Sequence, residues 1–223
     1  MAPTQGQASA GEFRRGNDGN ADTRSQIFAA TEELLAKVPL HDLSVAQIIE
    51  QAEISRATFY AYFSSKFDVV AGLLTKVADD SYELARLFIE RADDEPPEDA
   101  IRRALEATAR LWTTHRFALR AAVEHWHSVA ELKTIWLGAA ARFTEAIAGE
   151  IDRQRATGIA PGGVDSAELT TALLWSTERS FYIAGLDIDT PLSAEAQAVP
   201  ALYALWRGSI YGADAEIASP RGL

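Results

Sequence analysis

The side chains with the most recognisable chemistry lie close together in residues 55–66, SRATFYAYFSSK. An arginine can bond guanine through two nitrogens, and a threonine offers a hydroxyl to a base edge or its methyl group to thymine. Tyrosine, serine and lysine are common partners of DNA phosphates, which position a protein without reading sequence. This segment therefore predicts a surface that contacts DNA, with Arg56 and Thr58 reading bases. The predicted contacts are Ser44, Ser55, Arg56, Ala57, Thr58, Tyr60, Tyr62 and Lys66.

The segment that has to position these side chains is residues 44–66. Its apolar residues recur with a period of about 3.6 and predict two short helices that each bury one face, with a break at Glu53 and Ile54. Ser44 and Ser55 stand where the helices begin, and a serine hydroxyl there can accept a bond from an unpaired backbone N–H. Two short helices joined by a tight turn are typical of a helix-turn-helix, whose second helix enters the DNA major groove. A surface hairpin of helices without any role in DNA binding is the alternative that spacing and composition leave open.

The rest of the chain predicts further helices, so the expected fold class is all-α. An amphipathic helix from about Ile27 to Val38 precedes the motif and ends before Pro39. A long helix runs from Lys66 to about Arg91 and is followed by an acidic, proline-containing linker. Later helices are predicted at about 101–112, 117–126, 129–151, 165–185 and 194–211, the last with a kink or restart at Pro200. No stretch alternates polar and apolar residues over more than about four positions, as a strand would.

The composition describes a globular chain with an acidic balance. The chain has 223 residues, of which 48% are hydrophobic, and a net charge of −11. Residues 1–76 hold seven Lys or Arg against nine Asp or Glu, and the remainder holds fourteen against twenty-three. The motif region is therefore the less acidic part, and weak non-specific binding to DNA is expected. No apolar run approaches the ~20 residues that span a bilayer, and there is no cysteine, so we expect a cytoplasmic protein without disulfides.

The sequence offers little for catalysis. It contains no G-x-G-x-x-G, P-loop, G-x-S-x-G or H-E-x-x-H motif. His125 and His127 are two positions apart, a spacing that points their rings away from each other on a helix. The carboxylates fit solvated helix faces. We therefore expect neither an enzyme nor a metal or cofactor site.

Several segments resemble one protein family. ISRATFYAYFSSKFDVV resembles the recognition-helix signature of the TetR family of bacterial one-component regulators, and SVAQIIEQA is similar to that family's first motif helix. TERSFYIAGLDIDTP and ALWRGSIYG resemble the TetR subgroup that contains the mycobacterial repressor of the ethionamide-activating monooxygenase. The similar segments span about residues 22–212. The family usually has glycine in the motif turn where this chain has Glu53, and a left-handed backbone there costs a non-glycine residue on the order of 1 kcal/mol.

The resemblance also implies a domain organisation. A helix-turn-helix domain at 21–66 is followed by a ligand-binding and dimerisation domain at 67–212. Composition predicts a disordered arm at 1–20, and residues 213–223 form a predicted tail.

Aromatic residues are concentrated after the linker, where all five tryptophans lie. Aromatic side chains fill helical cores, but an aromatic-lined cavity also suits an apolar ligand, so a filled core and an open tunnel both remain. The resemblance implies a tunnel, and the residues that match its lining are Trp112, Trp136, Phe143, Ile147, Leu174, Thr177, Phe181 and Trp206, to which we add Phe117. The subgroup's best-known member has asparagines in place of Leu174 and Thr177. The Thr177 hydroxyl is then left to orient a ligand.

Two functions are consistent with these features. The first is a homodimeric DNA-binding regulator, expected to be a repressor, that a small hydrophobic effector releases from its double-stranded operator. The dimer would form through the helices at about 165–185 and 194–211, because apolar residues such as Leu169, Trp175 and Ile183 occupy more than one face. The second is a helical ligand-binding or scaffold protein that has lost sequence-specific DNA binding.

Overall fold

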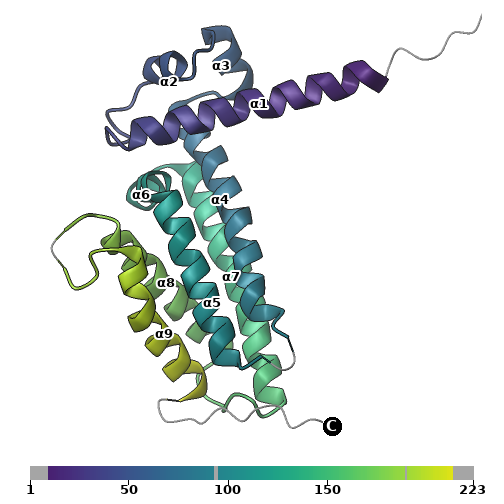
Figure 1. Cartoon of the computed structure of the whole chain (residues 1–223), viewed down its shortest axis with the longest axis vertical. Coiled ribbons are helices and arrows are strands. Elements are labelled where there is room, and N and C mark those ends of the chain that lie inside the picture. The colour runs from purple at the N-terminus through teal and green to yellow at the C-terminus, as the bar shows by residue number, and fades with distance from the viewer. Residues whose placement is uncertain (1–9, 93–94, 189, 213–223) are drawn as a thin grey trace, which may run out of the picture. The chain divides into compact units, whose positions relative to one another are not determined.

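The computed structural model describes residues 10–92, 95–188 and 190–212, with side chains from Asp22 onward. Within these ranges the chain forms nine α-helices and no β-strand, which confirms the predicted all-α class (Figure 1). The chain divides into two compact units after Val70. The division falls slightly beyond residue 66 because Val69 and Val70, at the start of the fourth helix, are buried. The predicted tail at 213–223 lies outside the described residues.

The N-terminal unit is a three-helix arrangement around a small apolar core. It contains α1 (Ala10–Leu35), α2 (Val45–Gln51), α3 (Arg56–Tyr62) and the first residues of α4 (Lys66–Ile89). Phe63 packs against Phe28 and Phe59, with ring centroids 5.6 and 6.1 Å away. The buried core residues are Ile27, Ala30, Leu35, Leu40, Leu43, Ile48, Phe59, Phe63, Val69 and Val70. Helix α1 thereby covers the buried faces of α2 and α3.

Helix α1 begins earlier than the sequence predicts. A disordered arm is expected over residues 1–20, whereas the helix starts at Ala10. Once packed residues such as Ile27 and Ala30 hold a helix, each further residue adds a backbone hydrogen bond without a new nucleation cost. The helix can therefore extend beyond its packed part. Residues 1–9 of the predicted arm lie outside the described residues.

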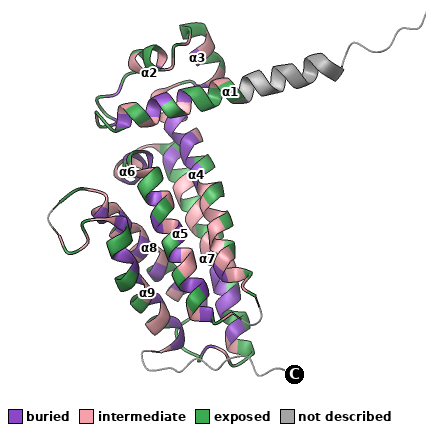
Figure 2. Cartoon of the chain, viewed as in Figure 1, coloured by how far each residue is buried: buried purple, intermediate pink, exposed green. Residues whose placement is uncertain are grey.

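The C-terminal unit contains the remainder of α4 and five further helices, α5 (Pro97–Thr114), α6 (Arg116–His125), α7 (Ala130–Ala156), α8 (Ser166–Ala184) and α9 (Glu195–Tyr211). Helix α5 packs along α9, and α8 packs against both α7 and α9. Buried residues follow one side of the long helices and exposed residues another (Figure 2). Helix α9 continues through Pro200 without the predicted restart, because a proline removes only one backbone bond and Val199 and Leu202 are buried beside it.

Buried polar contacts fasten α9 at both of its ends. At its start, the Arg116 guanidinium donates to both carboxylate oxygens of Glu195, at 2.8 and 2.7 Å, and the Glu195 side chain is 2% exposed. At its end, the Tyr211 hydroxyl donates to Oε1 of Gln154 at 2.6 Å. Nε2 of Gln154 in turn donates to Glu150 at 2.6 Å. These bonds tie α9 to α6 and α7. None of the helices in the described ranges is both long and apolar enough to cross a membrane.

Candidate nucleic-acid interface and ligand cavity

Helix α2 has capping hydrogen bonds at both ends. Its cap Ser44 accepts a hydrogen bond from the Gln47 N–H at 3.2 Å, while the Gln47 side chain accepts from the Ser44 N–H at 2.8 Å. At the other end, the N–H groups of Glu53 and Ile54 bond back to Glu50 and Ile49, at 3.1 and 3.2 Å. This pattern is a Schellman motif, which requires a left-handed residue. Glu53 has φ 51°, so the left-handed turn considered from the sequence is present.

Serine also caps the second motif helix, α3. Oγ of Ser55 accepts a hydrogen bond from the Thr58 N–H at 2.9 Å and lies 2.7 Å from the Thr58 hydroxyl oxygen. Because the two hydroxyls share one hydrogen bond, one of their two protons stays available to an outside acceptor. The cap therefore fixes both side chains and still leaves a donor at the start of α3.

The exposed side of α3 carries one cation beside an aromatic ring. The Arg56 guanidinium lies 6.0 Å from the Tyr60 ring centroid, as residues one helical turn apart can. Tyr60 is 51% exposed, and its ring meets the buried ring of Phe59 edge-on at 5.3 Å. Ala57 is exposed next to Arg56, and Tyr62 is half-buried. The structure thus brings Ser55, Arg56, Ala57, Thr58 and Tyr60 together on one accessible stretch.

Lys66, a predicted phosphate contact, also makes bonds within the N-terminal unit. Its ammonium group donates to the backbone carbonyls of His41 and Leu43, at 2.9 and 2.7 Å. Two of its three donors are therefore engaged inside the N-terminal unit. Lys66 ties the start of α4 to the loop before α2, where Ser44 is likewise engaged in its cap. These two residues position the motif.

A cavity of about 190 Å³ lies within the C-terminal unit, bounded by α4, α5, α7, α8 and α9, with Leu119 from α6. Seven of the nine predicted lining residues border it, namely Trp112, Trp136, Phe143, Ile147, Leu174, Thr177 and Trp206. Sequence reasoning missed the contribution of α4, which supplies Leu74, Val77, Ala78, Ser81, Ala85 and Phe88. Several of these residues recur with helical spacing along α4, and this apolar periodicity could have indicated that the helix contributes to the cavity.

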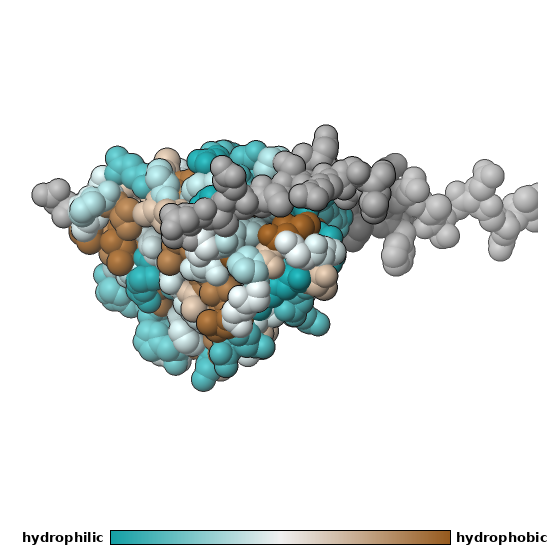
Figure 3. Space-filling model, turned by 90° about the horizontal axis from the view of Figure 1, so that it is seen from below, coloured by the Kyte–Doolittle hydropathy of each residue, from teal (hydrophilic) through white to brown (hydrophobic). Residues whose placement is uncertain are grey.

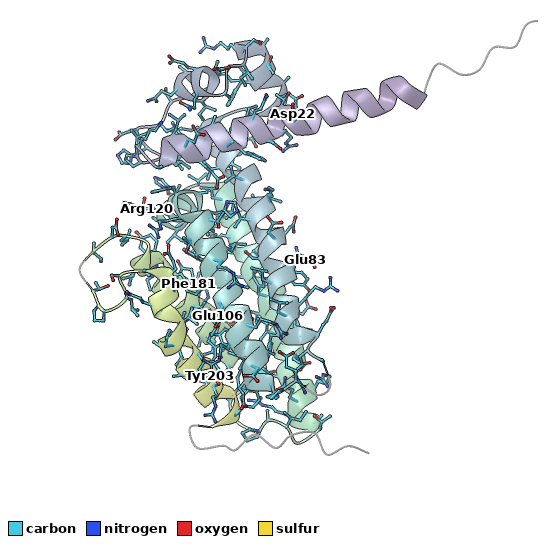
Figure 4. The ribbon with its side chains drawn as sticks, in the orientation of Figure 1. Asp22, Glu83, Glu106, Arg120, Phe181 and Tyr203 are labelled. Atoms are coloured by element: carbon cyan, nitrogen blue, oxygen red, sulfur yellow. The ribbon has the colours of Figure 1, made fainter. Side chains whose placement is uncertain are left out.

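Two predicted lining residues lie elsewhere. Phe117 is 38% exposed on the outer side of α6, because the inward side of that helix is taken by Ala118, Leu119 and Ala122. Phe181 is fully buried and packs behind Trp112, with ring centroids 6.0 Å apart. Figure 4 places Phe181 among the helices of the unit. Both predictions as lining residues are corrected by these positions.

The Thr177 hydroxyl is also engaged, contrary to the expectation that it orients a ligand. It donates to the Leu173 carbonyl and accepts from Nε1 of Trp206, each at 2.8 Å. Sequence reasoning missed the next residue, Glu178, which borders the cavity. Burial raises the pKa of the Glu178 carboxyl, and the charge of Arg179 partly opposes this rise.

Both units match known families. Residues 27–73 match the bacterial regulatory proteins of the tetR family, and residues 101–212 match the C-terminal domain of the transcriptional regulator EthR. The HTH-type transcriptional regulator EthR of Mycolicibacterium smegmatis is 33% identical over 194 residues, covering 86% of this chain and 87% of that protein. The regulator of the same name from Mycobacterium tuberculosis is 31% identical over 207 residues, covering 92% and 95%.

Solved structures share the fold. GusR of Salmonella enterica has a TM-score of 0.68 at 17% identity, covering 85% of this chain and 95% of its own. The fatty acid degradation regulator FadR from Bacillus halodurans has a TM-score of 0.69 at 16% identity, covering 83% and 95%. At such identities the likeness concerns the fold alone, whereas the sequence matches extend over both units. The chain belongs to the TetR family of bacterial DNA-binding transcriptional regulators and carries an EthR-type C-terminal domain.

Proposed function

We propose that this regulator is a homodimeric repressor that a small apolar effector releases from its operator. The observation that carries the proposal is the participation of α4 in the cavity wall. Helix α4 is continuous from Lys66 to Ile89, so its first residues belong to the DNA-binding unit and its later residues border the cavity. A molecule that displaces the α4 wall therefore acts on the same helix that begins in the DNA-binding unit.

Helix α3 supplies the contacts with DNA in this proposal. Arg56 reads a base, and the Ser55–Thr58 hydroxyl pair offers its remaining donor to a base or phosphate. Tyr60 lies on the same side of the helix and contacts the phosphate backbone. Because one motif covers only one half-site, a symmetric operator needs two copies spaced by about 34 Å, one turn of DNA.

The second copy is proposed to pair through α8 and α9. Ala201, Ala204 and Leu205 lie exposed on α9, with Leu205 43% exposed, and an apolar helix face of this kind can pack against its symmetric equivalent. The bonds at both ends of α9 hold this face in place. Hydrophobic residues form separate patches, interrupted by hydrophilic ones, over the face seen in Figure 3.

Release requires that the effector prefers the conformation that does not bind DNA, because equal affinity for both conformations shifts nothing. A tenfold change in operator affinity needs about 1.4 kcal/mol of coupling. Burial of two methylene groups in an apolar cavity supplies about 1.6 kcal/mol, so an effector that loses the burial of two such groups in the DNA-bound conformation suffices.

Footprinting on the DNA upstream of the chain's own gene, with and without 1-decanol, tests the proposal. We expect protection of two half-sites separated by one helical turn and its loss as 1-decanol is added. Leu174→Trp, which fills the cavity from α8, should keep the footprint and resist 1-decanol. Ala141→Trp, at an exposed position of α7, another helix of the cavity wall, is the control and should respond like the wild type. Absence of any protected site, or equal release of Leu174→Trp, contradicts the proposal.

A further inference from the structure

The hydroxyl groups around the cavity are largely occupied by the helices that carry them. Ser81, Thr108 and Thr177 each donate to the backbone carbonyl four residues earlier, at 2.7, 2.8 and 2.8 Å. The Thr177 oxygen also accepts from Trp206. These side chains therefore add little polarity to a wall made mostly of aliphatic and aromatic groups. A ligand's polar group can instead meet Thr144 or Glu178, which also line the cavity.

Glu178 is the only ionisable residue among the cavity-lining residues in the described part of the chain. Its side chain is 12% exposed, and its Oε1 is buried without a hydrogen-bond partner. The nearest ion-pair partner is Nε of Arg179, 4.0 Å from Oε2. That arginine is 56% exposed and lies over the Tyr182 ring at 5.0 Å, so it neutralises the carboxylate poorly. The cavity wall thus contains an incompletely paired carboxylate.

An incompletely paired, buried carboxylate is costly, and a ligand ammonium group removes that cost by forming a charge-assisted hydrogen bond. Aromatic faces can stabilise the same cation, and Trp136, Trp175 and Trp206 all line this cavity. The apolar wall, which includes five apolar residues of α4, suits an alkyl chain. A ligand carboxylate, in contrast, meets a like charge at Glu178.

We propose that the cavity selects apolar amines, with the alkyl part among the aromatic and α4 side chains and the ammonium group on Glu178. This inference rests on the proposed function only in that the cavity admits a small molecule. It goes beyond that function because it assigns the charge of the effector and the residue that recognises it.

The test compares decylamine, 1-decanol and decanoate, which share one alkyl chain length, by isothermal titration calorimetry on the full chain below their micellar concentrations. Decylamine should bind the wild-type protein about tenfold or more tightly than 1-decanol, and decanoate should bind most weakly. Glu178→Gln keeps the shape of the side chain without its charge, and it should bring decylamine within about twofold of 1-decanol. Glu106→Gln is the control, because Glu106 is an exposed carboxylate on α5, another cavity helix (Figure 4).

Unchanged decylamine affinity in a Glu178→Gln protein that unfolds at the wild-type temperature overturns the inference. Decanoate binding as tightly as decylamine to the wild type does so too. If none of the probes binds, the inference falls together with the cavity's role as an effector site. Operator release is scored separately: selective amine binding that leaves the DNA complex intact contradicts the proposed function alone. Release by 1-decanol without any preference for the amine contradicts the amine inference alone.

Discussion

The caps of the two motif helices in the N-terminal unit and the ion pair that holds the start of α9 in the C-terminal unit differ in the chain distance between their partners. In the N-terminal unit the bonds that shape α2 and α3 join neighbours, Ser44 with Gln47 and Ser55 with Thr58. In the C-terminal unit Arg116 and Glu195 are 79 positions apart in the chain. Neighbours can bond as soon as their helix forms, whereas distant partners meet only once the unit has assembled. The surface proposed to contact DNA is therefore specified by a short segment, whereas the cavity depends on the packing of a whole unit.

The largest effect is expected where a distant bond is broken. Arg116→Ala leaves the buried Glu195 carboxylate without its partner and should lower the free energy of unfolding by about 3–5 kcal/mol. The matched control is Arg120→Ala, which breaks the exposed pair between Arg120 and Glu124 within α6 and should cost about 0.5 kcal/mol. Urea denaturation followed by circular dichroism measures both values. Equal losses of unfolding free energy for the two variants would contradict the expectation that the distant, buried pair contributes more to stability than the local, exposed pair.

The DNA-contacting surface should respond most strongly at Arg56. Arg56→Ala is expected to lose about 1–3 kcal/mol of operator affinity and to relax the preference at one base position. Fluorescence anisotropy with the footprinted operator and its single-base variants measures both effects. Lys37→Ala is the control, because Lys37 is an exposed cation of the same unit that lies outside the motif. Wild-type operator affinity in a folded Arg56→Ala protein would show that Arg56 does not contribute to DNA binding.

Substitution of Lys66 distinguishes a role in stability from a role in DNA contact. Lys66→Met keeps the apolar stem but leaves the carbonyls of His41 and Leu43 without their donor, so unfolding should become easier by about 1–2 kcal/mol. Thermal unfolding and operator binding are measured on the same preparation. Unchanged stability together with weaker binding to every DNA sequence would restore the phosphate contact predicted from the sequence.

The smallest effect concerns the turn between α2 and α3. Glu53→Gly should stabilise the protein by about 0.5–1 kcal/mol, because glycine adopts the left-handed conformation of this position at no steric cost. Glu50→Gly, three residues earlier and in the last turn of α2, should destabilise it by up to about 1 kcal/mol. Opposite signs for these two exchanges identify the turn geometry as the cause, and a loss of stability for both would exclude it.

The same contrast explains how far the sequence could be interpreted. The capping serines, the turn at Glu53 and the all-α class follow from local patterns, and the structure contains each of them. The role of Lys66 could not be predicted, because its partners lie 25 and 23 positions earlier and meet it only in the folded unit. Local sequence patterns do not predict contacts between residues that are so far apart in the chain.

The cavity was predictable in part. Apolar spacing and the family resemblance identified seven of the residues that border it, all of them outside α4. Neighbouring residues of a helix point about 100° apart, and thus Phe117 faces outward while Leu119 borders the cavity. No periodic pattern separates Trp112, which borders the empty space, from Phe181, which packs behind it. That difference depends on how side chains from several helices fill the interior. The position of Glu178 at the cavity depends on the same packing.

The indole rings of the cavity wall have a spectroscopic consequence. All five tryptophans of the chain belong to the C-terminal unit, and four of them, Trp112, Trp136, Trp175 and Trp206, border the cavity. Intrinsic emission excited at the indole band therefore originates in one unit only, and the helix-turn-helix unit contributes no signal. Nε1 of Trp206 is hydrogen-bonded to Thr177, so loss of that bond changes the polarity around an emitting ring. The unlabelled protein thus carries its own optical reporter of the cavity in the C-terminal unit, and the helix-turn-helix unit contains no indole ring.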